Sequence, residues 1–336
     1  MKTKFINDSE NITAELLEGY TLAFKDIVKL GGENIVVRTN AKSGDKVAVV
    51  AFGGSGHEPA VSGFVGEGML DCSVVGDIFA APGAQRLFAA LQMFKREAGI
   101  VLLVLNHSGD VMSGNMAMQL ASRMGIKVKS IITHDDISAG LDAADDDRRG
   151  LAGAIVMYKV LGAAAEAGKS LDEIIEIGER LNKNIATLAV ATGSCSHPQN
   201  GMVITEMEKG KMQIGMGQHG EAGQGGTENI VSADDTATRM VSQLMAKLVA
   251  ARGDKMLLYI NGVGSSTLME QFIVYRAAAK VLEDAGVEVV HGHAGELLTV
   301  QESGGFQMIL ARLDSDHVDY LKNYKANAPY WKCFGK

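Results

Sequence analysis

Lys46–Phe52 reads KVAVVAF and runs directly into Gly53-Gly54-Ser55-Gly56-His57-Glu58-Pro59. A nearly continuous apolar run of this length is typical of a strand buried on both faces of a parallel sheet. The glycine-rich segment after it would lie at the carboxyl end of that strand, which is the edge where α/β sheets bind ligands. The stretch therefore predicts an α/β fold with a polar ligand loop at 53–59.

The same alternation continues on the C-terminal side of this loop. Gly99–Asn106 is a second apolar strand that ends in His107-Ser108-Gly109-Asp110, and Val128–Thr133 is a third that ends in His134-Asp135-Asp136. Helices are expected over 11–25, 85–94, 115–124, 151–167 and 171–181. Strand, polar loop and helix in repetition indicate an open α/β sheet.

The second half of the chain alternates less regularly between strands and helices. We predict two α/β domains with open, mainly parallel or mixed sheets. The N-terminal domain covers 1–186 and carries the glycine-rich loops at strand ends, and the C-terminal domain covers 187–336 and carries the loop of His219.

The composition excludes several classes of protein. The 336 residues are 46% hydrophobic and 21% charged, as in a globular protein, and the net charge of −8 argues against nucleic acid as a partner. No apolar run reaches the roughly 18 residues of a membrane span. Three widely spaced cysteines indicate reduced thiols, so we expect a cytoplasmic protein without a membrane partner.

Gly215–Gly220 matches the GxGxxG pattern, and three interpretations stay open for it. A dinucleotide site needs a helix directly after the glycines, whereas here Glu221–Gly226 adds further glycines that disfavour a helix. A glycine-rich surface turn is the second interpretation. The third is a loop that brings backbone and the His219 imidazole close to a small ligand.

His57 and Asp110 follow neighbouring predicted strands and are candidates for a proton-handling pair. An Asp after Ser-Gly is otherwise a common turn former. GxxxxGK[ST] does not occur, so the chain has no ordinary phosphate loop. His107 could line a pocket, while His317, within 314–319, is expected to be solvated.

The remaining histidines give weaker signals. His134, His291 and His293 lie at the ends of predicted strands. His291 and His293 lack a third ligand, so no metal is assigned to them.

Several segments together resemble the dihydroxyacetone kinase K subunit over the chain from about Lys4 onward. In chain order they are 53–59, Gly76-Asp77-Ile78-Phe79, Ser108-Gly109-Asp110, Arg148–Ala152, Leu161–Glu166, Gly217-Gln218-His219-Gly220-Glu221 and Ile260-Asn261-Gly262. The first is long and specific, and the others are modest singly but fall in the family's order.

The resemblance implies a two-domain subunit, usually a homodimer, that binds dihydroxyacetone between its domains. His219 would bond to the ketone carbon as a hemiaminal, with His57 and Asp110 as acid/base groups at the hydroxyl that is phosphorylated. The substrate-binding residues would be Gly53, Gly54, Ser55, Gly56, His57, Asp110 and His219. No cofactor is expected on this chain, because ADP or ATP with Mg²⁺ would sit on a separate L-type subunit.

Departures from the family pattern leave the substrate open. Leu105-Asn106-His107 replaces a stretch that often carries lysine, and Ala222 stands where proline is common. A four-carbon ketose such as erythrulose is therefore an alternative. A ketose-sensing regulator of transcription is another, although such a protein needs the binding histidine and not the acid/base pair. An oxidoreductase using nicotinamide would depend on the GxGxxG match alone.

Overall fold

The computed structural model describes residues 4–204, 206–217, 219, 221, 223 and 226–335. Gln218, Gly220 and Ala222, which the sequence analysis placed in the His219 loop, lie outside the described residues. The eight helices of the described part are α1 (Ile12–Ala23), α2 (Ala84–Met93), α3 (Ser108–Arg123), α4 (Gly153–Glu166), α5 (Leu171–Asn182), α6 (Ala233–Leu248), α7 (Leu268–Asp284) and α8 (Ser315–Lys322).

The first half of the chain builds a six-stranded mixed sheet. In sequence its strands are β1 (Val28–Gly32), β2 (Ile35–Arg38), β3 (Ala48–Ser55), β4 (Cys72–Ile78), β5 (Ile100–Leu105) and β6 (Val128–Thr133). Their spatial order is β1-β2-β4-β3-β5-β6, with β4, β3, β5 and β6 parallel and β1 and β2 antiparallel at one edge. Gly53, Gly54 and Ser55, which were expected in the loop, are the last residues of central strand β3, so the loop begins only at Gly56.

The second half builds another six-stranded sheet, in the order β11-β10-β12-β7-β8-β9. Its strands are β7 (Ile185–Ala191), β8 (Lys211–Ile214), β9 (Thr227–Asn229), β10 (Lys255–Gly262), β11 (Glu288–Gly295) and β12 (Gly305–Arg312). Among the described strands of this sheet, only the β10–β11 pair is parallel. A small ribbon of β13 (Ala326–Ala328) and β14 (Trp331–Cys333) completes the fold. The expected α/β class with mixed sheets is confirmed.

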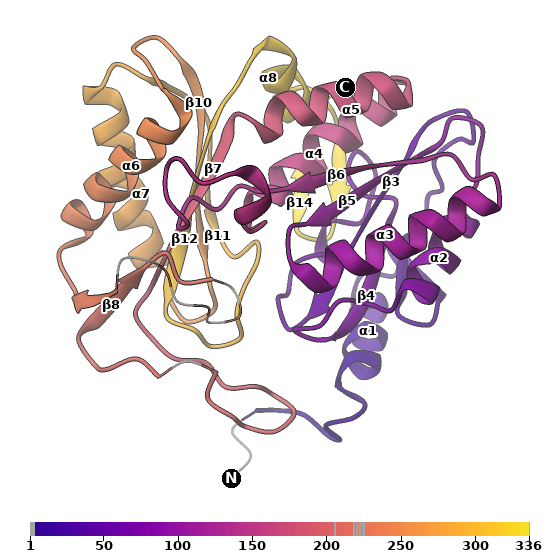
Figure 1. The fold of residues 1–336 in the computed structure, drawn as a ribbon, viewed down its shortest axis with the longest axis horizontal. Coiled ribbons are helices and arrows are strands. Elements are labelled where there is room, and N and C mark those ends of the chain that lie inside the picture. Colours follow the sequence, from indigo (N-terminus) through magenta and orange to yellow (C-terminus); the bar gives the residue numbers. More distant parts are fainter. Residues whose placement is uncertain are drawn as a thin grey trace.

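The two sheets lie side by side with α4 between them (Figure 1). Helix α4 packs against both β3 and β7, and it is buried from Gly153 to Ala165. A helix that is apolar on every side is stable only when its whole surface is covered. One apolar cluster accordingly runs from Val49 in β3 through α4 to Tyr259 in β10. This apolar core contacts both sheets. The predicted domain boundary at 186/187, which falls inside β7, stays a prediction.

Two sequence-based expectations are wrong in detail. Ser108 and Asp110 were expected in a loop before a helix at 115, whereas α3 begins at Ser108 and places Asp110 in its first turn. His317 was expected to be solvated, whereas it is buried and its Nε2 lies 3.1 Å from the carbonyl oxygen of Ile177. Helix α8 presses this ring against α5, a tertiary contact that a local acidic sequence does not reveal.

No helix among the described residues is both long and apolar enough to cross a lipid bilayer.

Packing of α4 leads to a stability prediction at Gly162. A Cβ at this position would meet the backbone of Met69, which cannot move aside like a flexible side chain. We expect Gly162→Ala to lower the free energy of unfolding by about 1–3 kcal/mol, the usual effect of overpacking. Gly19→Ala on α1 is the matched control, because a Cβ there meets nothing within 4 Å. Urea denaturation of both variants checks this, and equal midpoints would contradict it.

Candidate functional site

The end of β3, which carries Gly53, Gly54 and Ser55, is held in place by close backbone packing and by its serine. A Cβ on Gly54 would lie 2.7 Å from the amide nitrogen of Ala80, so only glycine permits this approach of two backbones. The hydroxyl of buried Ser55 lies 2.9 Å from Oγ1 of Thr13 and donates to the carbonyl oxygen of Gly76. Ser55 therefore ties the loop to α1 and β4.

His57 is fixed where this loop meets the segment before β12. The ring is buried, Nδ1 lies 2.8 Å from the carbonyl oxygen of Thr299, and Gln301 donates to the carbonyl oxygen of Gly56. A carbonyl oxygen only accepts, so Nδ1 of His57 carries a hydrogen and Nε2 of the neutral ring is an acceptor. The ring of Phe79 packs beside His57, with 4.9 Å between centroids.

The start of α3 brings two more polar side chains to the same place. His107 is the N-cap residue, and its Nε2 lies 2.9 Å from the carbonyl oxygen of Gly150. Asp110, two residues into α3, has a buried Oδ1 without a hydrogen-bond partner among the described residues. A buried unpaired acceptor is costly unless a ligand or water satisfies it. Asp110 is therefore suited to accept a hydrogen bond from a bound hydroxyl.

His219 lies in the loop after β8 and contacts the side chains from the end of β3 and the start of α3. Its Nε2 lies 3.2 Å from Nε2 of His57, and its ring centroid lies 5.2 Å from that of His107. On the other side of the ring, Nδ1 lies 3.2 Å from a carboxylate oxygen of Glu221. Residues 162 positions apart in the chain thus share one cluster of imidazoles.

One small cavity of about 30 Å³ joins these residues. Its wall includes Gly53, Gly54, His57, Asp110 and His219. The three predicted catalytic side chains and two of the predicted substrate contacts therefore meet at one space. The other two predicted substrate contacts, Ser55 and Gly56, do not line this cavity. The Ser55 hydroxyl donates to the carbonyl oxygen of Gly76, and the N–H of Gly56 donates to the carboxylate of Glu58.

Burial sets the charge states around the cavity. Burial, reinforced by nearby His219, lowers the pKa of His57 to about 3, so this ring is neutral at physiological pH. Burial raises the pKa of Asp110 to about 7, against a smaller opposing effect of His219. Burial also acts to raise the pKa of Glu221, but the hydrogen bond and charge of His219 outweigh it and hold the value at about 2. A carboxyl poised near neutrality is what a general base requires.

The described residues of the His219 loop do not support the dinucleotide interpretation. Strand β9 follows the glycines directly and the next helix, α6, begins only at Ala233. The required helix start is therefore missing from the described residues, although 218, 220, 222, 224 and 225 lie outside them.

A cation could find ligands on one side of the cavity. One nitrogen each of His107 and His219 and an oxygen of Glu221 lie within 4.8 Å of one another. The sequence analysis assigned no metal, and a His-carboxylate pair also has the simpler role of orienting a ring.

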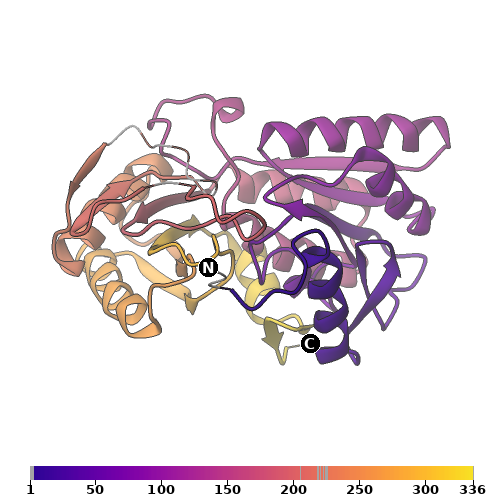
Figure 2. The same cartoon turned by 90° about the horizontal axis from the view of Figure 1, so that it is seen from below.

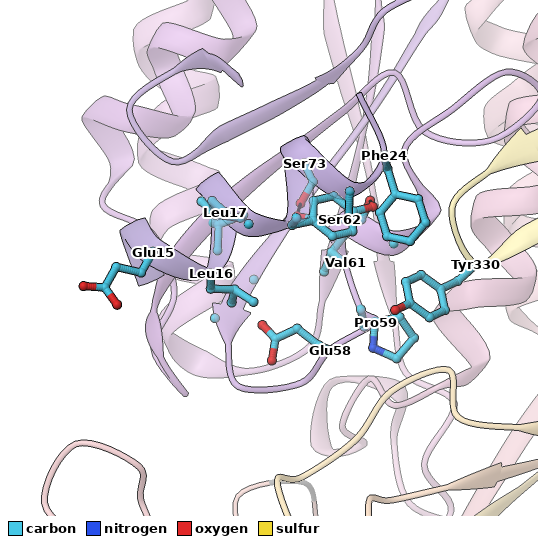
Figure 3. A pocket seen from close by; sticks show the side chains of 18 residues that line it. Glu15, Leu16, Leu17, Phe24, Glu58, Pro59, Val61, Ser62, Ser73 and Tyr330 are labelled. Carbon is cyan, nitrogen blue, oxygen red and sulfur yellow. Dashed lines mark hydrogen bonds between the residues drawn. The ribbon is translucent and has the colours of Figure 1, made fainter. Parts of the chain in front are cut away.

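A larger apolar pocket of about 410 Å³ lies behind the same loop (Figure 3). It lies between α1 and residues 58–63, with Tyr330 at one side and the Glu58 carboxylate beside Leu16. It shares the Gly53-Gly54 backbone with the small cavity but contains none of the three catalytic candidates. The greater volume of this pocket therefore does not identify it as the site of the chemistry.

Some residues of the site were not singled out from the sequence. Glu221 was noted only as part of a motif, and the spacing of two from His219 was the available signal. Arg149, which forms ion pairs with Asp136 and Glu221, was part of the similar segment 148–152. Phe79, which packs beside the His57 ring, was part of the similar segment 76–79. Thr299 acts through its backbone carbonyl, which no local pattern indicates.

Comparison with known proteins gives relatives over nearly the full length of the chain. The PTS-dependent dihydroxyacetone kinase, dihydroxyacetone-binding subunit DhaK, of Lactococcus lactis is 36% identical and covers 95% of this chain and 96% of its own. The DhaKLM operon coactivator DhaQ of the same species is 32% identical, covering 98% and 100%. The native crystal structure of the dihydroxyacetone kinase of C. freundii superposes with a TM-score of 0.89 at 30% identity, covering 99% of this chain and 61% of that one.

The family model of the Dak1 domain matches residues 18–329, a range that holds every residue of the cavity. The segments that resemble the K subunit and the fold of the whole chain support the same family. The chain belongs to the Dak1 domain family.

Proposed function

We propose that this chain is the ketose-binding subunit of a dihydroxyacetone kinase and that it holds its substrate as a hemiaminal on His219. The observation that carries the proposal is the convergence of His219, His57 and Asp110 on one small cavity. The name of the L. lactis relative, a dihydroxyacetone-binding subunit, supports the choice of ketose.

The proposed binding step is an addition to the ketone. Nε2 of His219 forms a bond to the carbonyl carbon, the π pair of the C=O bond moves to its oxygen, and that oxygen takes up a proton to become a hydroxyl. Nε2 of His57, 3.2 Å from Nε2 of His219, is placed to carry this proton. An alcohol such as glycerol offers no carbonyl, so the bond itself selects ketoses.

Asp110 and His57 are proposed to handle the proton of the hydroxyl that is phosphorylated. The unpaired Oδ1 of Asp110 can accept the hydrogen bond of that hydroxyl, and its ionised carboxylate can remove the proton as phosphoryl transfer begins. The neutral ring of His57 keeps positive charge away from this base. The nucleotide and Mg²⁺ would be supplied by an L-type partner subunit.

Reconstitution tests the need for a partner. The purified chain with ATP, Mg²⁺ and dihydroxyacetone is expected to give no triose phosphate, whereas adding the L-type subunit encoded in the same genome restores formation. Turnover by the chain alone would overturn the split arrangement. Parallel assays with erythrulose decide the ketose, because the preferred substrate is the one with the higher kcat/KM.

A regulator of transcription is the second candidate, because the coactivator DhaQ matches this chain over its full length. The acid/base pair beside His219 favours the kinase, since ketose sensing needs no base at a hydroxyl. Failure of every L-type subunit to support turnover, together with retained ketose binding, would exclude the kinase and leave the regulator.

A further inference from the structure

Glu221 contacts His219 at two points. Its Oε2 accepts a hydrogen bond from the backbone N–H of His219 at 2.9 Å, and its Oε1 lies 3.2 Å from Nδ1 of the ring. A single carboxylate therefore fixes both the backbone and the ring of the same histidine. The two residues are partly exposed, at 29% and 41% of their side chains, so neither is held by burial alone.

We propose that Glu221 is a positioning residue for the nucleophile: it keeps the hydrogen of His219 on Nδ1, leaves Nε2 facing the ketone, and balances the positive charge of the alkylated ring. The proposal rests on the hemiaminal on His219 and adds to it the group that selects the reacting nitrogen. An imidazole whose other nitrogen is held by a carboxylate has a fixed tautomer and orientation.

The hydrogen bonds around the two rings define where the protons lie. Nδ1 of His57 donates to Thr299, so Nε2 of the neutral His57 ring presents a lone pair. Nδ1 of His219 donates to the Glu221 carboxylate. Nε2 of the His219 ring is then the nitrogen with the lone pair that can attack a ketone, and it lies 3.2 Å from Nε2 of His57.

Addition of the ketone takes up one proton. The lone pair on Nε2 of His219 forms the bond to the carbonyl carbon, and the π pair of the C=O bond moves to the oxygen. That oxygen takes one proton from solvent, carried by Nε2 of His57, and becomes a hydroxyl. The ring of His219, with a hydrogen on Nδ1 and the new bond at Nε2, then carries one positive charge beside the Glu221 carboxylate.

Glu221 is itself held by Arg149. The guanidinium lies 3.7 Å from the Glu221 carboxylate, contacts Asp136 and donates to the carbonyl oxygen of Gly215 at 3.0 Å. This arrangement links the His219 loop to the segment before α4. A Cβ on Gly217 would meet the ends of both the Arg149 and the Glu221 side chains, so a larger residue there would have to displace this ion pair.

Several titratable groups face the His219 ring and bear on any pH test. They are His57 after β3, His107 and Asp110 at the start of α3, Arg149 before α4 and Glu221 in its own loop. Because Asp110 also titrates near neutrality, the test compares variants that both retain it.

The test is Glu221→Gln, with ketose affinity measured by titration calorimetry between pH 5 and 9. Gln keeps the shape but not the charge. We expect dihydroxyacetone to bind about 10- to 100-fold more weakly, the usual cost of removing a group that orients a functional histidine. Without the carboxylate, neither the hydrogen on Nδ1 nor the positive charge of the alkylated ring is stabilised. Glu221→Asp restores the charge and should recover part of the affinity.

Controls separate this inference from the proposed function. Glu228→Gln, which removes an exposed carboxylate paired with Arg239, should bind like the wild type. Thermal melting confirms that each variant is folded. If His219→Ala loses the adduct but Glu221→Gln keeps wild-type affinity and pH profile, the role of Glu221 is overturned and the hemiaminal stands. If a chelator abolishes binding to the wild type, Glu221 serves as a metal ligand and the positioning role also fails.

Discussion

Asp110→Asn is expected to lower kcat by about 10²–10⁴-fold while the ketose still binds. The amide has nearly the same shape as the carboxyl group but cannot take the proton of the attacking hydroxyl. Covalent attachment depends on His219 and should persist. Coupled assay of triose phosphate with the L-type partner present measures turnover, and calorimetry measures binding. Full activity in this variant would exclude Asp110 as the base.

The pH profile of the wild type carries the same information. Because Asp110 must be ionised to act, kcat should rise with pH through about 7 and this dependence should be absent from Asp110→Asn. The contribution of Asp110 to folding stability should instead fall with rising pH. The folded-state pKa lies above the unfolded value of 3.8, so the contribution of Asp110 to stability falls as the pH rises from about 4 to about 7. Asp110→Asn should therefore be more stable than the wild type at pH 8.

His219→Ala should have the second large effect, on binding. Without the covalent bond, a three-carbon sugar keeps only a few hydrogen bonds, each worth about 1 kcal/mol net. We expect ketose affinity to fall by roughly 10²-fold or more, and the preference for dihydroxyacetone over glycerol to shrink with it. His293→Ala on β11 is the matched histidine control and should bind normally. A variant at 219 that still discriminates ketose from glycerol would show that selection lies elsewhere.

The sequence predicted best those elements whose burial is total. An apolar run gave β5 to within one residue at each end, since a strand covered on both faces has no polar positions. Another run gave β3 only up to Phe52, because the strand continues through Gly53, Gly54 and Ser55. Strand β4 was not predicted, because Ser73, Gly76 and Asp77 interrupt its apolar character, although it pairs with β2 and β3 on its two sides. Long-range pairing overrides a weak local pattern in such a strand.

The start of α3 was misplaced for a local reason. Asp110 was placed in the loop that ends the second strand, because Ser-Gly-Asp is a common turn sequence, and the helix was expected only from Asn115. An acid in the first helical turn is nevertheless favourable, because it lies near exposed backbone N–H groups and the positive end of the helix dipole. This helix start, next to the end of β5, is what brings Asp110 to the cavity.

The meeting of His57 with His219 could not be derived from periodicity. His57 follows a strand of the first sheet and His219 follows a strand of the second, and Figure 2 shows these two parts of the fold from below. Hydrogen bonds of Gly56 and His57 to residues 299–301 hold the two loops together. The family resemblance supplied the pairing before any geometry was known. It gave no role to Glu221, whose importance follows only from the distances.

Carbon-13 NMR of dihydroxyacetone labelled at its carbonyl carbon tests the central claim most directly. On binding to the wild type, the signal should move from the carbonyl region to that of a tetrahedral carbon carrying nitrogen and oxygen. The moved signal should also couple to nitrogen-15 placed in the histidine rings and be missing with His219→Ala. A bound ketose whose labelled carbon stays in the carbonyl region would contradict the hemiaminal and, with it, the role of His219.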